Sequence, residues 1–208
     1  QVRDHIGARE SAEIIFTRGI TDSINTVAFG MGALIKPHQN VVITALEHHS
    51  NIVPWQMLCE RTGATLRYIP INEKGELVLH SLEEIIDEHT AMVAFNHISN
   101  SLGTINPVST ILARAKEVGA WTLVDGAQSG PHAKVDVQEW DVDFFTLASH
   151  KMYGPTGLGV LYGKRERLEA LPPYQGGGEM IATVTLEKST YAAIPHKFEA
   201  GTPHIEGV

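Results

Sequence analysis

Lys151 stands directly after an apolar, strand-like run in the stretch DFFTLASHKMYGPTG, which extends from Asp143 to Gly157. An apolar strand end would desolvate the lysine ammonium, as a lysine that forms a Schiff base with a carbonyl compound requires. A lysine after a strand is also a common solvated surface residue, and for Lys151 alone this alternative stays open. The chemistry of this position therefore depends on the groups that surround it.

Asp125 ends a fully apolar segment in the stretch LVDGAQS. A carboxylate buried at such a position needs a cationic or hydrogen-bonding partner. A protonated pyridine nitrogen is one such partner, and an aspartate that holds this proton makes pyridoxal phosphate an electron sink. Gln128 could then turn back toward the 3-oxygen of the ring. The alternative is that Asp125 is only a helix-capping or turn residue.

His48 lies in the stretch EHHSNIVPW, at the expected end of another strand. An imidazole at this place can stack on a flat aromatic ring. A metal site is the rival interpretation, because several ligands could converge, namely His48, His49, His97, His150 and Asp125. The histidines lack the spacing of a helical H-x-x-x-H site, and adjacent histidines on an extended chain point in opposite directions. We therefore expect no metal site.

Thr21 follows the stretch FTRG at the expected start of a helix. The free N–H groups and the positive dipole end of a helix N-terminus bind anions, and the Thr21 hydroxyl would add a contact. Thr21 could equally be a plain N-cap. The position is thus a candidate phosphate site.

Strand-length apolar segments alternate with segments of helical period up to about Arg165, which is the pattern of βαβ units and a mainly parallel sheet. The expected strands are Ile14 to Arg18, Asn40 to Leu46, Thr65 to Pro70, Ala91 to Ile98, Trp121 to Asp125, Asp143 to Ala148 and Leu158 to Tyr162. The expected helices are Thr21 to Ile35, Asn51 to Thr62, Ser81 to Glu88 and Val108 to Val118.

Local signals refine this pattern. Ser81 and Glu84 have the spacing of a capping box, and Gly119 stands where a helix would end in a residue of positive φ. The stretch LPPYQGGGEMIATVT predicts a turn followed by a glycine-rich hairpin or flap.

Ligands of open parallel sheets bind at the carboxyl ends of the strands. The polar residues expected there are Thr21, Glu47 to His49, His97 to Asn100, Asp125 to Ser129 and Ser149 to Lys151.

The composition narrows the class of partner. The chain has 208 residues, 43% of them hydrophobic, and a formal net charge of -8 without a run of basic residues. These properties argue against a nucleic-acid partner and against an anionic membrane surface, and no apolar run approaches the ~20 residues that span a bilayer. The single cysteine, Cys59, suggests a reducing compartment, so we expect a cytoplasmic location. The first and last residues suggest a piece of a longer protein.

Seven ordered motifs give the sequence a specific resemblance. They are FTRGITDSIN, EHHSNIVPWQ, HISNSLGTINP, VDGAQS, SHKMYGPTGLGVLYGK, GGGEMI and FEAGTP. In order and spacing they resemble the cysteine desulfurases of aminotransferase class V, with GGGEMI and HHSNIVPW similar to the SufS-like group II rather than to the IscS/NifS-like group I. The resemblance covers essentially the whole chain.

This resemblance implies an α/β fold, the large domain of the type I pyridoxal-phosphate-dependent transferases, with a mainly parallel seven-stranded sheet flanked by helices. Residues 1–208 would be the cofactor-binding large domain of a protein whose N-terminal segment and C-terminal small domain are absent from this chain. Lys151 would hold pyridoxal 5'-phosphate covalently, and Lys151 and His48 would be the catalytic residues. The implied cofactor contacts are Thr21, His48, Asn100, Asp125, Gln128, Ser149, His150, Lys151 and Thr202.

The resemblance assigns each of these contacts a part of the cofactor. His48 would stack on the ring and Asp125 would bind its nitrogen, with Gln128 and Asn100 near the ring oxygen and the substrate carboxylate. The phosphate ligands would be Thr21 and His150. Thr202 is similar to a threonine that in this family reaches the phosphate of the partner subunit, which implies a homodimer. The family usually has a serine where this chain has Ala148, so Ser149, one place later, is an expected phosphate ligand that departs from the pattern.

Family members convert L-cysteine to L-alanine and leave the sulfur as a persulfide on an enzyme cysteine, from which it passes to an acceptor protein for iron-sulfur cluster assembly. The persulfide cysteine and the substrate-binding arginine of the family lie in a C-terminal region that these residues do not include. Cys59 stands in an expected helix, where it should pack. We therefore expect the 208 residues to bind the cofactor with little or no turnover.

Two alternatives stay open from the sequence. A selenocysteine lyase or a cysteine sulfinate desulfinase of the same family would use the same ring-binding residues, because other parts of the site determine which bond is broken. A non-catalytic remnant of the fold, acting as a binding or dimerisation module, is the second alternative. The complete set of Lys151, Asp125 and His48 argues against it.

Overall fold

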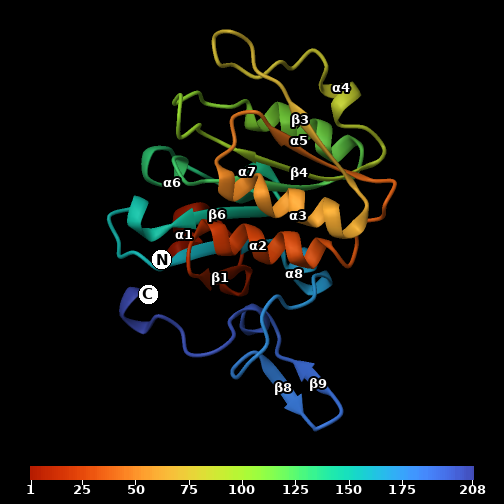
Figure 1. Cartoon of the computed structure of the whole chain (residues 1–208). Coiled ribbons are helices and arrows are strands. Elements are labelled where there is room, and N and C mark those ends of the chain that lie inside the picture. Colours follow the sequence, from red (N-terminus) through yellow and green to blue (C-terminus); the bar gives the residue numbers. More distant parts are fainter.

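A seven-stranded sheet forms the centre of the protein, as Figure 1 shows for the computed structural model of residues 1–208. Its order is β1-β7-β6-β5-β4-β2-β3, and only β7 runs antiparallel to its neighbours. The predicted mainly parallel, seven-stranded sheet is confirmed. The strands are β1 (Ile14–Thr17), β2 (Asn40–Thr44), β3 (Thr65–Ile69), β4 (Thr90–Asn96), β5 (Trp121–Asp125), β6 (Phe144–Ala148) and β7 (Gly159–Gly163).

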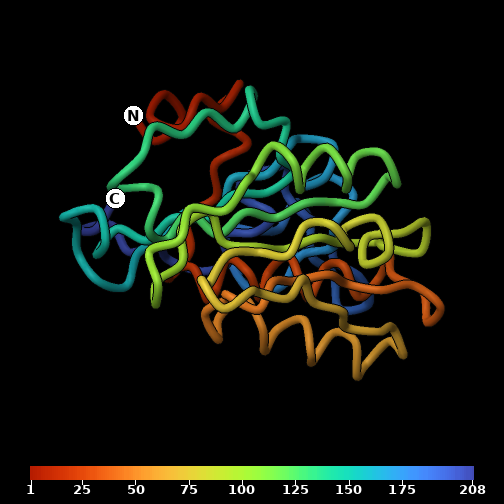
Figure 2. The backbone as a smooth tube through the Cα atoms, turned by 90° about the horizontal axis from the view of Figure 1, so that it is seen from above, coloured from red at the N-terminus to blue at the C-terminus, as the bar shows by residue number.

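Helices cover both faces of this sheet (Figure 2). One apolar cluster joins the strands to α2 (Ile20–Met31), α3 (Val53–Thr62) and α8 (Arg165–Ala170), and we call this side the α2 face. A second cluster joins them to α1 (Val2–Ile6), α4 (Leu82–Ile85), α5 (Val108–Glu117) and α7 (Val137–Trp140), on the α5 face. The short helix α6 (Ser129–His132) follows β5.

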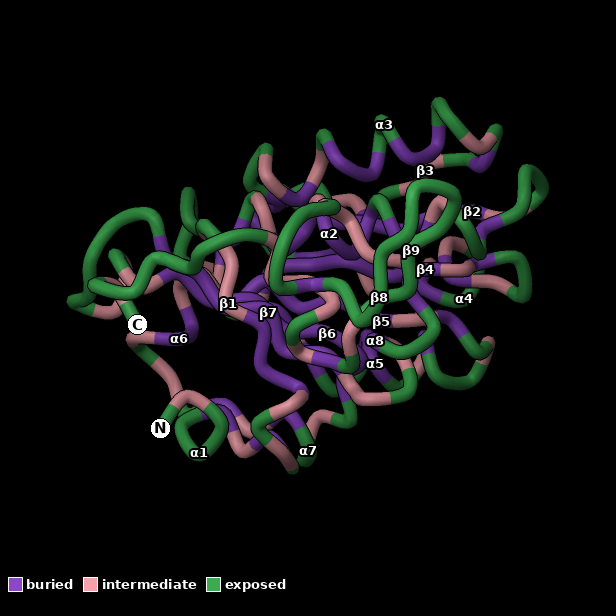
Figure 3. Tube along the Cα trace, turned by 90° about the horizontal axis from the view of Figure 1, so that it is seen from below, coloured by how far each residue is buried: buried purple, intermediate pink, exposed green.

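The inner strands of the sheet are buried on both faces, and every residue of β2, β6 and β7 is buried (Figure 3). This explains their continuous apolar sequences, which are typical of a sheet covered on both sides. Alternate residues of β6 point to opposite faces, with Phe144 in the cluster of the α2 face and Phe145 in that of the α5 face. The position of a residue in this alternation therefore determines which face of the sheet its side chain meets at the end of a strand.

Short turns of 3₁₀ helix complete the chain. They are η1 (Ser11–Glu13), η2 (His49–Asn51), η3 (Ser149–Lys151), η4 (His196–Phe198) and η5 (Ile205–Gly207). The structure places η2 before α3, so the helix expected from Asn51 starts at Val53, where Pro54 occupies the first turn. Gly119 has a φ of 74°, as predicted. The capping box predicted at Ser81 is wrong, because the Ser81 backbone is not extended and its side chain makes no capping bond.

The glycine-rich segment after α8 leads into a separate hairpin, as predicted. Strands β8 (Ile181–Val184) and β9 (Ser189–Tyr191) pair antiparallel, and every residue of both is exposed. Figure 1 shows the hairpin projecting away from the main sheet. None of the helices is both long and apolar enough to cross a membrane.

Candidate active site

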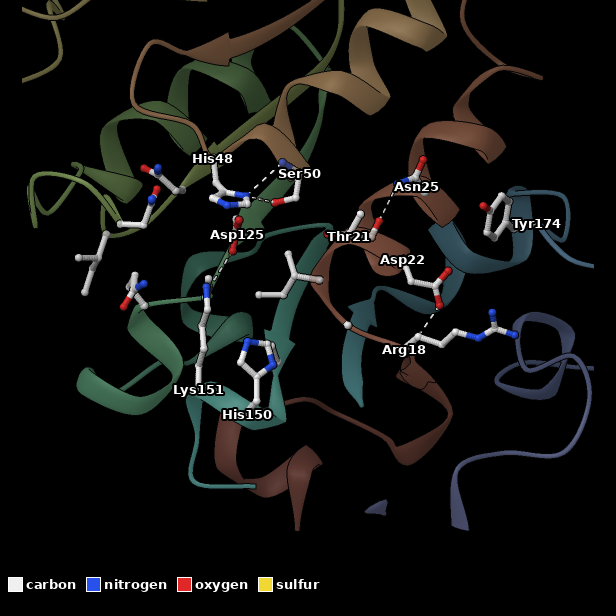
Figure 4. Close-up of a pocket in the computed structure, with 18 residues that line it drawn as sticks. Arg18, Thr21, Asp22, Asn25, His48, Ser50, Asp125, His150, Lys151 and Tyr174 are labelled. Atoms are coloured by element: carbon white, nitrogen blue, oxygen red, sulfur yellow. Dashed lines mark hydrogen bonds between the residues drawn. The ribbon is translucent and has the colours of Figure 1, made fainter. Parts of the chain in front are cut away.

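A cavity of about 660 Å³ opens at the carboxyl ends of the parallel strands (Figure 4). Its walls come from the start of α2 and from the segments that follow β2, β4, β5 and β6. Seven of the predicted site residues line it, namely Thr21, His48, Asn100, Asp125, Gln128, His150 and Lys151. Residues far apart in the sequence therefore meet in one place.

Asp125 is the last residue of β5 and only 3% of it is exposed. Its Oδ1 accepts a hydrogen bond from the backbone N–H of Ala127 at 2.8 Å. Burial raises the pKa of Asp125, and the Ala127 N–H and the charges of Lys151 and His48 act against this shift. Burial of the carboxylate as an anion thus costs free energy, and a cationic partner in the cavity would stabilise the anion.

The chain can turn after Asp125 only because Gly126 has no side chain. A Cβ atom on Gly126 would lie 2.1 Å from Cζ of Phe145 and 2.7 Å from the carbonyl oxygen of Thr146. This close approach to β6 sets where the segment from Ala127 to Gln128 enters the cavity wall.

Lys151 closes the 3₁₀ turn η3, which begins directly after the fully buried strand β6. Its side chain is partly buried and points toward Asp125 and His48 (Figure 4). The turn therefore brings an amine to a cavity wall that also carries a buried carboxylate. An amine so placed can attack a carbonyl group in the cavity and can exchange a proton with a bound molecule.

His48 follows β2 with an extended backbone, φ −70° and ψ 150°. Its Nδ1 accepts a hydrogen bond from the backbone N–H of Ser50 at 3.1 Å and lies 2.9 Å from the Ser50 Oγ. Because Nδ1 accepts a backbone N–H, the neutral ring carries its proton on Nε2. Ser50 thereby fixes both the orientation and the tautomer of the imidazole, which is one of the side chains that line the cavity in Figure 4.

Glu47, just before His48, is a buried acid that braces this wall. It accepts hydrogen bonds from the Asn51 Nδ2 at 2.7 Å, the Thr44 Oγ1 at 2.5 Å and the backbone N–H of Asn96 at 3.0 Å. Burial raises the pKa of Glu47 to about 8, although these donors act in the opposite direction. The side chain ties the loop that carries His48 to the end of β4.

The start of α2 forms the opposite wall. Gly19 has a φ of 150°, and a Cβ atom on Gly159 of β7 would lie 2.4 Å from the Gly19 Cα, so two glycine backbones touch here. This contact seats the helix N-terminus against the sheet. Thr21 and His150 line the cavity beside it, so that N–H groups, a hydroxyl and an imidazole are available to an anion.

Two of the predicted contacts lie outside the cavity. The Ser149 hydroxyl donates to the backbone carbonyl groups of Pro155 and Leu158, the latter at 3.1 Å, and faces a different hollow. This geometry argues against the expected contact of Ser149 with the phosphate. Thr202 is exposed and lines a neighbouring cavity of about 800 Å³.

The structure adds residues that the sequence did not reveal. Asn96 lines the cavity at the end of β4, where its amide donates to the Leu46 carbonyl at 2.6 Å. Tyr174 joins the wall from beyond α8 and packs on Phe29, with ring centroids 5.4 Å apart. Asn96 carries the same signal as Asp125, a polar residue that ends an apolar strand. Tyr174 carries no comparable signal.

Cys59 and the histidines have other surroundings. The Cys59 thiol is buried on α3, and burial raises its pKa to about 11. Such a thiol is a poor nucleophile, because the thiolate is the reactive form. His97 packs its ring edge-on against Trp140, with centroids 4.9 Å apart. No group of three or more histidine, cysteine or acidic side chains is arranged to hold a metal ion.

The sheet, the cavity at the carboxyl ends of its strands and the lysine-aspartate-histidine set define a class of protein. The sequence model of the aminotransferase class-V family matches residues 1–208, and the chain belongs to this family.

Within the family the chain is similar to cysteine desulfurases. It is 54% identical to the cysteine desulfurase of Cronobacter sakazakii over 98% of this chain and 50% of that protein. The crystal structure of the cysteine desulfurase CsdA, in its S-sulfonic acid form, from Escherichia coli superposes with a TM-score of 0.97 at 38% identity, over 99% of this chain and 52% of that one. The chain spans about half the length of the curated relatives it matches.

A more distant structure bears on the cofactor. A mutant of C-DES, with glycine covalently linked to its PLP cofactor, superposes with a TM-score of 0.83 at 25% identity, over 97% of this chain and 54% of that one.

Proposed function

We propose that the cavity binds pyridoxal 5'-phosphate and that the chain is the cofactor-binding large domain of a cysteine desulfurase. The observation that carries the proposal is the convergence of Lys151, Asp125 and His48 in one cavity. Family membership supports the cofactor, and the similarity to cysteine desulfurases supports the reaction. The proposed domain comprises residues 1–208, with the small domain outside this chain.

The residues present fit such a cofactor. Burial raises the pKa of the Asp125 carboxyl group. A cationic ring nitrogen beside it would stabilise the charged form of this carboxylate. The His48 imidazole, oriented by Ser50, offers a flat face to an aromatic ring. The N-terminus of α2 with Thr21 and His150 would hold the phosphate, and Gln128 and Asn100 would lie near the ring oxygen and the substrate carboxylate.

Bound pyridoxal phosphate supplies an electron sink that stabilises negative charge at the substrate Cα. The residues of this chain supply position and protons. Asp125 would keep a proton on the ring nitrogen, the Lys151 Nζ, once neutral, would take the proton from the substrate Cα, and His48 would stack on the ring.

We propose L-cysteine as the substrate and L-alanine as the product, with the sulfur passing to an enzyme thiolate and then to an acceptor protein for iron-sulfur cluster assembly in the cytoplasm. Cys59 is unsuited to accept the sulfur, because it is buried and its pKa is raised to about 11. The persulfide cysteine would therefore lie outside these 208 residues. The exposed Thr202 is proposed to reach the phosphate site of a second subunit in a homodimer.

The test is cofactor binding by wild-type chain and the K151A variant. Wild type should develop the visible absorption of a cofactor bound to a lysine, and K151A should bind the free aldehyde without this absorption. Borohydride should fix the cofactor to Lys151, as peptide mass mapping would show. Labelling of another lysine, or an unchanged spectrum in K151A, would contradict the proposal.

The reaction requires a separate measurement on the full-length protein. Alanine release should be followed with cysteine, selenocysteine and cysteine sulfinate as competing substrates. A preference for cysteine supports desulfurase activity. Release of alanine from cysteine by the 208 residues alone would contradict our assignment of the sulfur acceptor.

A further inference from the structure

Three polar side chains form a row across neighbouring strands beneath the candidate cofactor site. Asn96 of β4 is the register partner of Asp125 of β5, and Asp125 is the register partner of Thr146 of β6. Register partners in parallel strands point to the same face. Two residues back along the strands, Ala94, Leu123 and Phe144 belong to the cluster of the α2 face. The row therefore points to this face as well, with Asp125 in the middle.

The two neighbours of Asp125 differ in their hydrogen bonds. Both ends of the Asn96 amide are hydrogen-bonded, since its nitrogen donates to the Leu46 carbonyl at 2.6 Å and its oxygen accepts from the Asn106 Nδ2 at 2.6 Å. Thr146 is 0% exposed, and its Oγ1 has no hydrogen-bond partner. Buried hydroxyl groups in proteins are nearly always paired, so an unpaired one calls for a physical reason.

Asp125 is short of donors. The hydrogen bond that the structure shows to its carboxylate comes from the Ala127 backbone N–H. The titratable groups that face it are Lys151 and His48 across the cavity and Glu47 at the end of β2. Burial raises the pKa of Asp125, so another donor would favour the charged form that a cationic ring nitrogen needs.

We propose that Thr146 is a positioning residue, whose hydroxyl donates to the Asp125 carboxylate when that carboxylate holds a protonated ring nitrogen. Neighbouring strands lie about 4.8 Å apart, so rotation of the Thr146 side chain about χ1 can bring its hydroxyl to the adjacent carboxylate. The Thr146 hydroxyl has no other bond to give up. The inference rests on the proposed function, since it assigns Thr146 to the same cofactor site.

The test compares Thr146→Val with Thr146→Ser and with a matched control, Thr122→Val. Valine keeps the shape of threonine without the hydroxyl, and serine keeps the hydroxyl. Thr122 lies in the same sheet, but its hydroxyl donates to Asp143 at 3.2 Å and accepts from the Asp143 backbone N–H at 3.0 Å. The readouts are the melting temperature without cofactor, the dissociation constant of pyridoxal phosphate, and the pH titration of its visible absorption.

We expect Thr146→Val to leave the melting temperature of the cofactor-free protein unchanged or higher, because it removes an unpaired buried hydroxyl. Cofactor binding should weaken about tenfold. The midpoint of the pH titration should rise by about one unit, since a less cationic ring leaves the attached lysine nitrogen more basic. Thr146→Ser should restore both values, and Thr122→Val should lower only the melting temperature.

Two failures can be told apart. If wild-type protein forms no lysine-bound cofactor, the proposed function is wrong. If wild type forms it and Thr146→Val binds and titrates the cofactor like wild type, only the role of Thr146 is overturned. A lower melting temperature of Thr146→Val with unchanged cofactor titration would likewise assign the hydroxyl to the stability of the sheet.

Discussion

Two buried aspartates at opposite ends of the central strands differ in how their charge is balanced. Asp143 precedes β6, is 4% exposed, and accepts from the Thr122 backbone N–H at 2.9 Å and the Arg167 Nε at 2.9 Å, with the Lys164 Nζ at 3.4 Å. Asp125 ends β5, is 3% exposed, and has one backbone donor. Arg167 and Lys164 balance the charge of Asp143 within the fold, whereas the carboxylate of Asp125 accepts a hydrogen bond only from a backbone N–H.

Under the proposed function, Asp143 serves the stability of the fold and Asp125 serves cofactor binding. A buried carboxylate without a paired charge lowers the stability of the cofactor-free fold, and such a cost is typical of a functional site. At the amino end of the strands Asp143 is paired, and the removal of one partner from such a buried pair is destabilising.

Asp125→Asn should have the largest effect on cofactor binding. Asparagine removes the charge that would pair with the ring nitrogen, and we expect about 100-fold weaker binding of pyridoxal phosphate, measured by absorbance titration. Because burial raises the pKa of Asp125, the cofactor-free variant should be as stable as wild type or more stable in urea unfolding. Tight cofactor binding by this variant would remove the distinction between the two aspartates.

Asp143→Asn is the matched control and should show the opposite pattern. Its loss leaves Arg167 and Lys164 without their shared carboxylate at the base of the sheet. We expect the free energy of unfolding to fall by about 2 kcal/mol, with no change in the dissociation constant of the cofactor. A variant that unfolds like wild type and binds the cofactor poorly would contradict our assignment.

Much of the fold follows from the sequence. The apolar runs predicted all seven strands of the main sheet, and β5 has the predicted bounds, because Asp125 is the first polar residue after an apolar strand. The direction of β7 was not predicted. The segment between β6 and β7 contains only the turn η3 and is too short for the crossover that a parallel pair requires. The antiparallel pairing could therefore have been predicted from the length of this segment.

The site was harder to predict where side-chain direction matters. The strand expected to run to Ile98 ends at Asn96, so Asn96 looked like a strand interior residue rather than part of a cavity wall. Ser149 lies only two residues before Lys151, yet its hydroxyl donates to the carbonyl groups of Pro155 and Leu158. This contact depends on the path of the loop that leads to β7, and the residues next to Ser149 do not reveal that path.

Glu47 allows the comparison to be extended to a third buried carboxylate. Its pKa is raised to about 8 from a usual 4.5, so between these values the native state binds a proton that the unfolded state has lost. Stability should therefore fall as the pH rises through this window, by up to about 1.4 kcal/mol per pH unit. Glu47→Gln should remove this loss.

Urea unfolding of the cofactor-free wild type and of Glu47→Gln at pH 5, 6.5 and 8 would measure the effect. The difference in stability between the two proteins should shift in favour of the glutamine variant as the pH rises. A difference that stays constant across this range would mean that Glu47 is ionised throughout, held by its three donors.

Ala148→Ser should give the smallest effect, and it tests the end of β6, the strand that pairs with the strand of Asp125. Ala148 is 2% exposed at the end of β6 and lines the cavity, at the place where the family that the sequence resembles usually has a serine. A hydroxyl here should add one hydrogen bond to the phosphate and tighten cofactor binding about fivefold. Ser149→Ala is the control, and it should leave binding unchanged because the Ser149 hydroxyl faces away from the cavity. Weaker binding in Ser149→Ala without a gain in Ala148→Ser would place the phosphate on the other side of β6 and would separate it from the start of α2.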